Sequence, residues 1–171
     1  MLELIERETE ASKAGKPSRI ILKVNSLIDK EIIDSLYEAS QAGVSIDLIV
    51  RGICGLVPDM KNLSENIRVR SLLGRYLEHS RIYYFENGVE APLLYLGSAD
   101  WMPRNFFRRV EAIFPVENSA MIEETMETLK AYFADNEFAK VLRPSGKYAA
   151  IPRRGDKNSI SVQRALSDKA N

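Results

Sequence analysis

The sequence has very few of the residues that build disulfide-stabilised domains or metal centres. Among 171 residues there is one cysteine, Cys54, and one histidine, His79. A single cysteine excludes an internal disulfide and a cysteine-based zinc site, and it is more typical of a small buried apolar group than of a nucleophile. A mechanism that needs two histidines cannot be completed within this chain.

Long apolar runs and an excess of charge are also absent. No apolar run approaches the roughly 18 residues of a membrane-spanning helix, and residues 1–20 are rich in charge, so we expect no membrane span and no signal peptide. The 24 basic residues balance 24 acidic ones, which argues against a protein that binds nucleic acid through overall positive charge. These absences favour a cytoplasmic protein, free or peripheral to the membrane.

The charge is distributed unevenly along the chain. Residues 51–109 contain nine basic and six acidic side chains, and eight of the nine basic residues are arginine. The planar guanidinium of arginine binds pairs of anionic oxygens through two parallel hydrogen bonds. This composition indicates phosphate or carboxylate recognition, with a solvated arginine-rich surface as the alternative interpretation.

Strand-like and helix-like segments alternate along the chain. Strands are predicted at 19–24, 44–50 and 66–70, and the Asn87-Gly88 dipeptide predicts a hairpin between strands at 81–86 and 92–97, followed by a strand at 109–115. Helices are predicted at 2–14, between a Ser26–Asp29 capping box and Gly43, at 71–78, at 119–134 and at 159–169, with an extended arm at 144–158. This order predicts an α/β fold with a mixed sheet in a single domain.

The single histidine lies near other polar residues at predicted strand ends. His79 and Arg81 project from one face of an extended chain, Glu86 ends the strand that follows, and Gly97-Ser98-Ala99-Asp100 comes after the next strand. The pattern His79-x-Arg81-x-x-x-x-Glu86 with Gly97-Ser98-x-Asp100 resembles a degenerate phospholipase D superfamily motif, in which lysine, aspartate and asparagine stand at positions 81, 86 and 100. The spacing matches, and three residue types differ.

Longer strings carry a more specific resemblance. Lys23-Val24-Asn25-Ser26-Leu27, Arg51-Gly52-Ile53-Cys54, Gly74-Arg75-Tyr76-Leu77-Glu78-His79 and Gly97-Ser98-Ala99-Asp100-Trp101-Met102 with Arg104-Asn105 occur in this order. They resemble the C-terminal, phospholipase-D-like domain of bacterial polyphosphate kinase over residues 2–154. The resemblance implies a domain at 1–158, with a C-terminal helix or tail at 159–171.

The resemblance also implies an activity. Polyphosphate kinases reversibly transfer the terminal phosphoryl group of ATP to inorganic polyphosphate through a phosphohistidine, so ATP or ADP and polyphosphate are the expected ligands. The phosphorylated histidine and the residues associated with Mg²⁺ belong to a sister domain that precedes this one. This chain is then part of a longer protein, whose remaining domains are expected partners and which is expected to be a homo-oligomer.

The resemblance assigns roles to individual residues. Arg51 and His79 correspond to positions that contact ATP, and His79 is expected to be catalytic and to face the phosphorylated histidine. The residues expected to line a path for the polyanion are Lys23, Asn25, Arg75, Arg81, Ser98, Asp100, Arg104 and Arg108. No residue of this chain is expected to ligate a metal.

Alternatives remain open for several of these residues and for the function. Lys23 and Asn25 are equally suited to satisfying backbone groups at a strand end or capping a helix. Asp100 is suited to capping a helix before Trp101, and Arg104, Arg108 and Arg109 to forming a solvated face. Two other functions compete. One is a phospholipase-D-like phosphodiesterase or nuclease half-site that dimerisation completes with a second His79, and the other is a non-catalytic module that binds polyphosphate.

Overall fold

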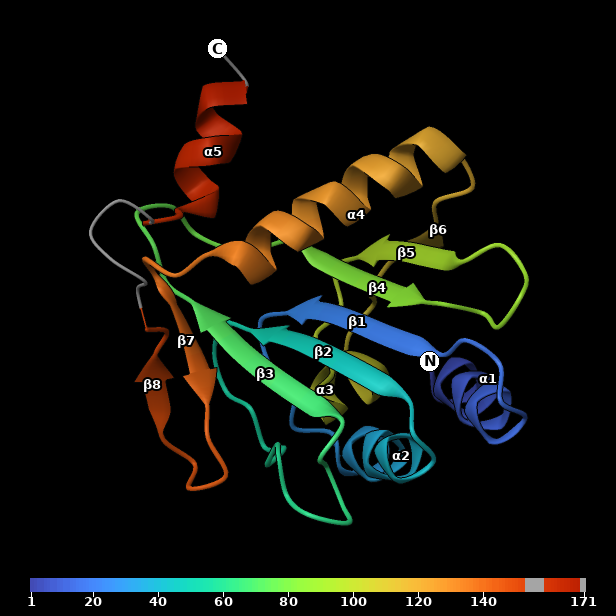
Figure 1. Cartoon of the computed structure of the whole chain (residues 1–171). Helices are drawn as coiled ribbons and strands as arrows, with labels where there is room; N and C mark the ends of the chain where they lie inside the picture. Colours follow the sequence, from blue (N-terminus) through green and yellow to red (C-terminus); the bar gives the residue numbers. More distant parts are fainter. Residues whose placement is uncertain (153–158, 170–171) are drawn as a thin grey trace.

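A mixed β-sheet forms the centre of the computed structural model, which describes residues 1–152 and 159–169. Within these residues eight strands are arranged in the order β6-β5-β4-β1-β2-β3-β7-β8 (Figure 1). The strands are β1 (Arg19–Val24), β2 (Ser45–Val50), β3 (Ile67–Leu72), β4 (Arg81–Phe85), β5 (Leu93–Gly97), β6 (Ile113–Pro115), β7 (Ala139–Leu142) and β8 (Tyr148–Ala150). The predicted α/β fold with a mixed sheet is confirmed.

The three central strands are parallel and the outer ones are antiparallel. β1 pairs in parallel with β2, and β2 with β3, whereas β4 runs antiparallel to β1 and β5 antiparallel to β4. β1 and β2 are buried along all but their first residue. Their near-continuous apolar sequences follow from this, because a central parallel strand is covered by helices on both faces.

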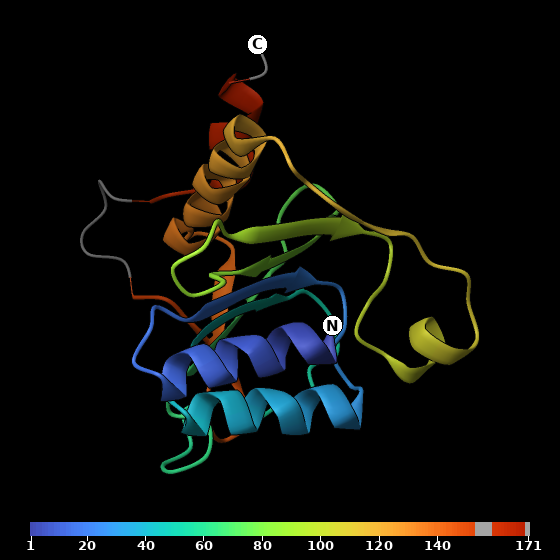
Figure 2. The same ribbon diagram turned by 90° about the vertical axis from the view of Figure 1, so that its right-hand side faces the viewer.

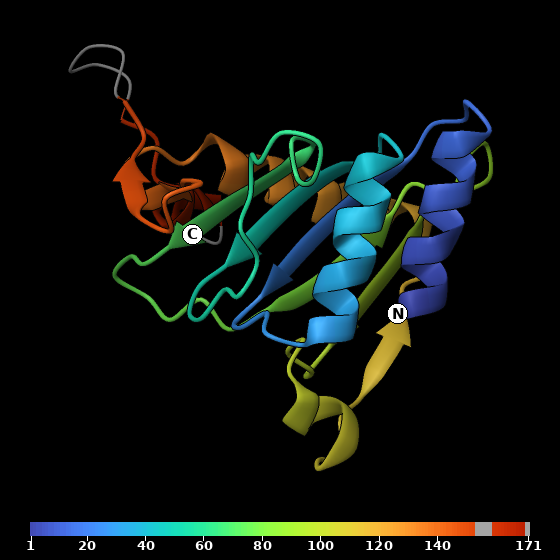
Figure 3. The same cartoon turned by 90° about the horizontal axis from the view of Figure 1, so that it is seen from below.

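Two helical layers enclose the sheet. The helices are α1 (Leu2–Lys13), α2 (Lys30–Gln41), α3 (Pro103–Phe107), α4 (Ser119–Ala134) and α5 (Val162–Lys169). α1 and α2 cover one face and α4 covers the other, while the short α3 projects beyond the sheet (Figures 2 and 3). Alternate residues of β1 therefore serve two cores: Ile20 and Leu22 pack in the cluster that includes Leu36 of α2, and Ile21 packs in the cluster that includes Leu129 of α4.

The pairing brings strand ends from across the sheet to one edge, here called the carboxyl edge. β1, β2, β3 and β5 end there, and β4 begins there, because Lys23 of β1 lies opposite Ile82 and Arg81 of β4 lies opposite Gly97 of β5. The hairpin turn between β4 and β5 lies at the opposite edge. Its Asn87 and Gly88 both adopt positive φ, 63° and 68°, as the predicted Asn-Gly turn requires.

Several predicted elements differ from the observed ones. Residues 71–78 are not a helix: Ser71 and Leu72 complete β3 by pairing with β7, and 73–80 is a loop held by long-range side-chain contacts. The Ser26–Asp29 capping box is also absent, because Asp29 itself caps α2 by accepting a hydrogen bond from the Ile32 N–H at 3.1 Å. The predicted strand at 109–115 shrinks to β6, and β7 was not predicted.

The C-terminal part of the chain is only partly described. The predicted extended arm at 144–158 contains β8, and its residues 153–158 lie outside the described residues, as does the predicted domain boundary at residue 158. The helix predicted at 159–169 is confirmed as α5, which starts three residues later.

Candidate functional site

Most of the predicted site residues gather at the carboxyl edge. Lys23 is the penultimate residue of β1, and Asn25 and Arg51 follow the last residues of β1 and β2. Arg75 and His79 lie in the loop 73–80, Arg81 begins β4, and Ser98 and Asp100 follow β5. Because many strand ends meet here, segments that are far apart in sequence supply one surface.

Asp100 is the polar centre of this edge. Its Oδ1 accepts hydrogen bonds from the backbone N–H groups of Asn25 at 2.7 Å and Ser26 at 3.2 Å, and both of its oxygens accept from Arg81, at 3.2 Å each. Asp100 and Arg81 are 3% and 8% exposed. The interpretation of Asp100 as a helix cap is wrong, because α3 begins after Met102. The pair instead ties the end of β1 to β4 and β5.

His79 lies against the guanidinium of Arg81. Nη1 of Arg81 donates to the backbone oxygen of His79 at 2.7 Å and lies 2.9 Å from the ring Nδ1 and 3.3 Å from Nε2. A guanidinium has no acceptor, so the ring nitrogen that pairs with it must accept, and the tautomer decides which nitrogen that is. His79 is exposed to solvent, so a ligand can reach its ring.

Arg51 is oriented by the side-chain amide of Asn25. Its Nε donates to Oδ1 of Asn25 at 2.6 Å, and Nδ2 of Asn25 lies 3.4 Å from Oδ2 of Asp100. Among the described residues neither Nη atom of Arg51 has a hydrogen-bond partner. A chain of contacts from Asp100 through Asn25 therefore fixes the Arg51 side chain while leaving the outer part of its guanidinium available for an anion.

Beneath the exposed residues lies a buried ionic network. Nζ of Lys23 lies 3.1 Å from Oε2 of Glu78 and donates to Oγ of Ser80 at 2.8 Å, and the hydroxyl of Tyr132 donates to the same Glu78 oxygen at 2.7 Å. Lys23 is 2% exposed. The structure thus places Lys23 below the surface of the site, where it supports the residues on either side of His79.

Burial and partners set the ionisation of this network. Burial lowers the pKa of Lys23 below its ordinary value, Glu78 acts in the opposite direction, and the positive charges of Arg51 and Arg81 lower it further. Burial raises the pKa of Glu78, but the hydrogen bonds from Gln163 and Tyr132 and the charge of Lys23 outweigh it, so the pKa ends below its ordinary value. Glu78 is therefore a carboxylate at neutral pH.

The remaining predicted residues are exposed and lie further out. Arg75 stacks on Tyr76 at 5.5 Å from the ring centre, and Arg104 and Arg108 lie on or next to the projecting helix α3. The hydroxyl of Ser98 donates to Glu111 and accepts from the N–H of Ala112 at 3.1 Å. The exposure of Arg104 and Arg108 agrees with the interpretation as a solvated face, and the structure gives them no contact with Arg51 or His79.

Four polar residues of this region were missed by sequence reasoning: Glu78, Glu111, Tyr132 and Gln163. Glu78 lies within a string that resembled the kinase family, but nothing in the string indicates a buried ion pair. Glu111 is joined to Ser98 and to Asn105 by side-chain hydrogen bonds, and the hydrogen bond from Ser98 lowers its pKa. Tyr132 and Gln163 lie on helices far from Glu78 in the sequence, so no local pattern predicts that they contact it.

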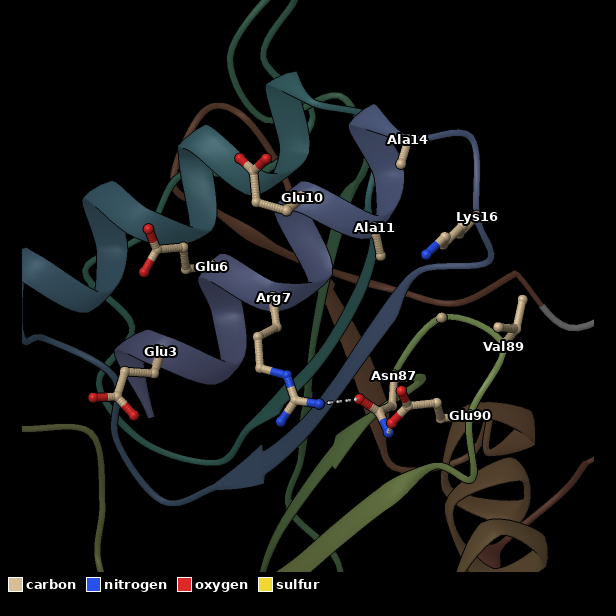
Figure 4. Close-up of a pocket in the computed structure, with 11 residues that line it drawn as sticks. Glu3, Glu6, Arg7, Glu10, Ala11, Ala14, Lys16, Asn87, Val89 and Glu90 are labelled. Carbon is tan, nitrogen blue, oxygen red and sulfur yellow. Dashed lines mark hydrogen bonds between the residues drawn. The ribbon is translucent and has the colours of Figure 1, made fainter.

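Two cavities differ in their relation to these residues. One of about 310 Å³ is lined by Arg51 and by residues 72–78, so it borders the candidate site. Another of about 500 Å³ lies at the opposite edge, between α1 and the β4–β5 turn, where Arg7 donates to Asn87 at 2.7 Å (Figure 4). None of the predicted site residues lines the second cavity.

Within residues 1–152 and 159–169, no group of three or more histidine, cysteine, aspartate or glutamate side chains is arranged to hold a metal ion. At the carboxyl edge, Asp100 is bonded to Arg81 and backbone donors, Glu78 to Lys23, and Glu111 to Ser98 and Asn105. In the same described residues, no helix combines the length and the apolar character that crossing a membrane requires.

This chain matches a family model and curated relatives that are named polyphosphate kinase. The family "Polyphosphate kinase C-terminal domain 2" matches residues 1–163. Polyphosphate kinases of Pseudomonas putida and of a Synechocystis strain share 48% and 51% sequence identity with this chain. Each alignment covers 99% of this chain and 23% of the relative. The chain thus spans about a quarter of the length of the curated relatives that it matches.

Solved structures support the fold. The crystal structure of polyphosphate kinase from Porphyromonas gingivalis matches with a TM-score of 0.92 at 43% identity, over 98% of this chain and 26% of that one. Nuc from Salmonella typhimurium, a phospholipase D family member, matches with a TM-score of 0.56 at 13% identity, over 80% of this chain and 88% of that one. The second likeness concerns the fold alone, and it confirms the predicted phospholipase-D-like sheet.

Proposed function

This chain belongs to the polyphosphate kinase family as its C-terminal domain 2, and we propose that it supplies the part of an ATP:polyphosphate phosphotransferase that holds phosphate groups during transfer. The observation that carries the proposal is the carboxyl edge itself. It presents the Nη donors of Arg51, which have no partner among the described residues, and the exposed ring of His79, both fixed by contacts that converge on Asp100. ATP or ADP and polyphosphate are the proposed ligands.

The physical argument follows from the charge of the reacting group. Phosphoryl transfer passes through a loose transition state whose negative charge spreads over peripheral oxygens, so positioning and electrostatic stabilisation carry the catalysis. Arg51 binds these oxygens with its Nη donors, already oriented by Asn25. One ring nitrogen of His79 accepts from Arg81, and the other carries the ring proton, which it donates to a phosphate oxygen.

The histidine that forms the phosphoenzyme is proposed to lie elsewhere in the longer protein. His79 is the only histidine in the sequence, and we assign it the second role, facing the phosphohistidine across the site. Asp100 and Glu78 do not suit the expected Mg²⁺, because Asp100 is bonded to Arg81 and to backbone donors and Glu78 is bonded to Lys23. No step of the proposed mechanism on this chain uses the metal.

Other proposals concern the surroundings of the chain. The remaining domains of the same polypeptide and a second copy of the whole protein are the proposed partners, and the cytoplasm is the proposed location. Lys23 and Asn25 support the phosphate-binding side chains through hydrogen bonds. Arg75, Arg104 and Arg108 are proposed to attract the polyanion at longer range, and Ser98 is proposed to line its path.

The experiment compares the 171-residue chain with the full-length kinase that carries it, each incubated with ATP and Mg²⁺. Polyphosphate should accumulate with the full-length protein and not with the chain alone, because the chain has one histidine. Robust synthesis by the isolated chain would refute the division of the site between domains. Cleavage of a phosphodiester substrate or DNA by the chain would instead favour a nuclease half-site completed by dimerisation.

A further inference from the structure

The loop that carries His79 is held by a residue from the far end of the chain. Gln163, in the first turn of α5, accepts a hydrogen bond from the N–H of Tyr76 at 3.0 Å. Its Nε2 donates to the backbone oxygen of Tyr76 at 2.8 Å and to Oε1 of Glu78 at 2.6 Å. The side-chain amide of Gln163 thus accepts one hydrogen bond through its oxygen and donates two through its nitrogen, all to the same loop. Gln163 is only 8% exposed.

The backbone of the loop packs directly on this amide. A Cβ atom placed on Gly74 would lie 2.4 Å from Oε1 and 2.7 Å from Cδ of Gln163. Such distances are too short for any side chain at position 74 unless the amide moves. Glycine at this position therefore permits the close approach, and the three hydrogen bonds of Gln163 oppose any movement of the amide.

The contacts fasten the chain on both sides of His79. Glu78, immediately before it, is bound by Gln163 and by Lys23, and Ser80, immediately after it, accepts from the same Lys23. His79 is exposed, and Arg81 contacts its backbone oxygen and its ring. Its position therefore depends on Arg81 and on the anchoring of Glu78 and Ser80, because the loop has no regular secondary structure to hold it.

α5 is itself anchored where it presents Gln163. The N–H of Val162 donates to Oδ2 of Asp135 at 2.9 Å, while Oδ1 of Asp135 accepts from the N–H groups of Phe138 at 2.8 Å and Ala139 at 3.0 Å. Asp135 and Val162 are both 0% exposed. The start of α5 is thereby fixed to the end of α4 and the start of β7, so the amide of Gln163 is held by rigid elements.

We propose that Gln163 is a positioning residue for His79, acting through Glu78 and the backbone of Tyr76, and that α5 is therefore part of the phosphotransferase site. The role in catalysis rests on the proposed function, whereas the role in holding the loop does not. Misplacing a catalytic group by about 1 Å typically lowers the rate about 100-fold, so loosening the loop should lower turnover more than substrate binding.

The first test measures amide hydrogen exchange in the 171-residue chain. Gln163→Ala should raise the exchange of residues 73–80 at least about tenfold and leave β1 and β2 protected, because only the loop loses its contacts. Arg164→Ala is the matched control, since it alters the next residue of the same helix and removes only an exposed ion pair with Glu137. Unchanged exchange at 73–80, or an increase spread over the whole sheet, would overturn the proposal.

The second test measures polyphosphate synthesis by the full-length kinase. Gln163→Ala should lower kcat about 10- to 100-fold with KM for ATP within about twofold, whereas Arg164→Ala should leave both near wild type. An unchanged kcat, or a higher KM at unchanged kcat, would overturn the positioning role. If the wild-type enzyme made no polyphosphate, the proposed function would fail, and the exchange measurement would still decide whether Gln163 holds the loop.

Discussion

Removing the negative charge of Glu78 tests the buried network that supports the site. Glu78→Gln leaves the Lys23 ammonium, 2% exposed, with only neutral partners: the Ser80 hydroxyl at 2.8 Å, the Tyr132 ring at 4.7 Å and the new amide. Breaking a buried ion pair by removing one partner costs about 3–5 kcal/mol. Because hydrogen-bond acceptors remain, we expect a loss near the lower end, about 3 kcal/mol in the free energy of unfolding.

The loss should depend on pH in a definite direction. Burial already lowers the pKa of Lys23, and Glu78 opposes this shift, so without the carboxylate the pKa of Lys23 falls further in the folded state. Between that lowered value and the ordinary lysine pKa of 10.5, the unfolded chain binds more protons than the folded one, so stability rises with pH. The difference between Glu78→Gln and wild type should therefore shrink as the pH rises from 7 toward 10.

Urea unfolding of the 171-residue chain at several pH values measures both effects. The double variant Lys23→Met/Glu78→Gln is the control, because it removes both charges and should recover most of the lost stability. A loss below about 1 kcal/mol at pH 7, a loss that does not change with pH, or a double variant as unstable as the single one would each refute the assignment of a buried ion pair.

Two further predictions concern contacts at the same edge. Asp100→Asn removes the charge opposite the buried Arg81 and should lower the free energy of unfolding by about 3–5 kcal/mol in urea unfolding; a change below about 1 kcal/mol would mean that Arg81 does not depend on that carboxylate. Gly74→Ala forces a Cβ against the Gln163 amide and should lower the free energy of unfolding by about 1–3 kcal/mol in the same assay. Most of this loss should disappear when Gly74→Ala is combined with Gln163→Ala. Additive effects of the two substitutions would contradict the close packing.

The sequence predicted the centre of the fold well, because the signals there are local. The apolar runs of β1 and β2 and the Asn87-Gly88 turn each act within a few residues, and all three appear where expected. The error at 71–78 has a tertiary origin. Ser71 and Leu72 pair with β7, nearly 70 residues later in the chain, and the following loop is held by Gln163. Helical spacing in this segment was outweighed by contacts that no short window of sequence contains.

The sequence indicated where the candidate site residues lie, but not their hydrogen-bond and ion-pair partners. Strand ends indicated the edge at which these residues lie, since Arg51 follows β2, His79 precedes β4 and Asp100 follows β5. The partners of these residues were not predictable in the same way. Asp100 has the chemistry of a helix cap, yet it binds the β1 backbone and Arg81, and the partners of Glu78 lie on β1, α4 and α5. Such contacts depend on how distant elements pack.

The most direct test of the central claim is the initial rate of polyphosphate synthesis from ATP by the full-length kinase with Arg51→Ala, beside Arg7→Ala. Both variants remove a guanidinium, but Arg7 lies at the opposite edge of the sheet and contacts Asn87 (Figure 4). If Arg51 holds phosphate oxygens in the transition state, its loss should lower the rate about 10²- to 10³-fold, with Arg7→Ala near wild type. Equal rates for the two variants would contradict the account.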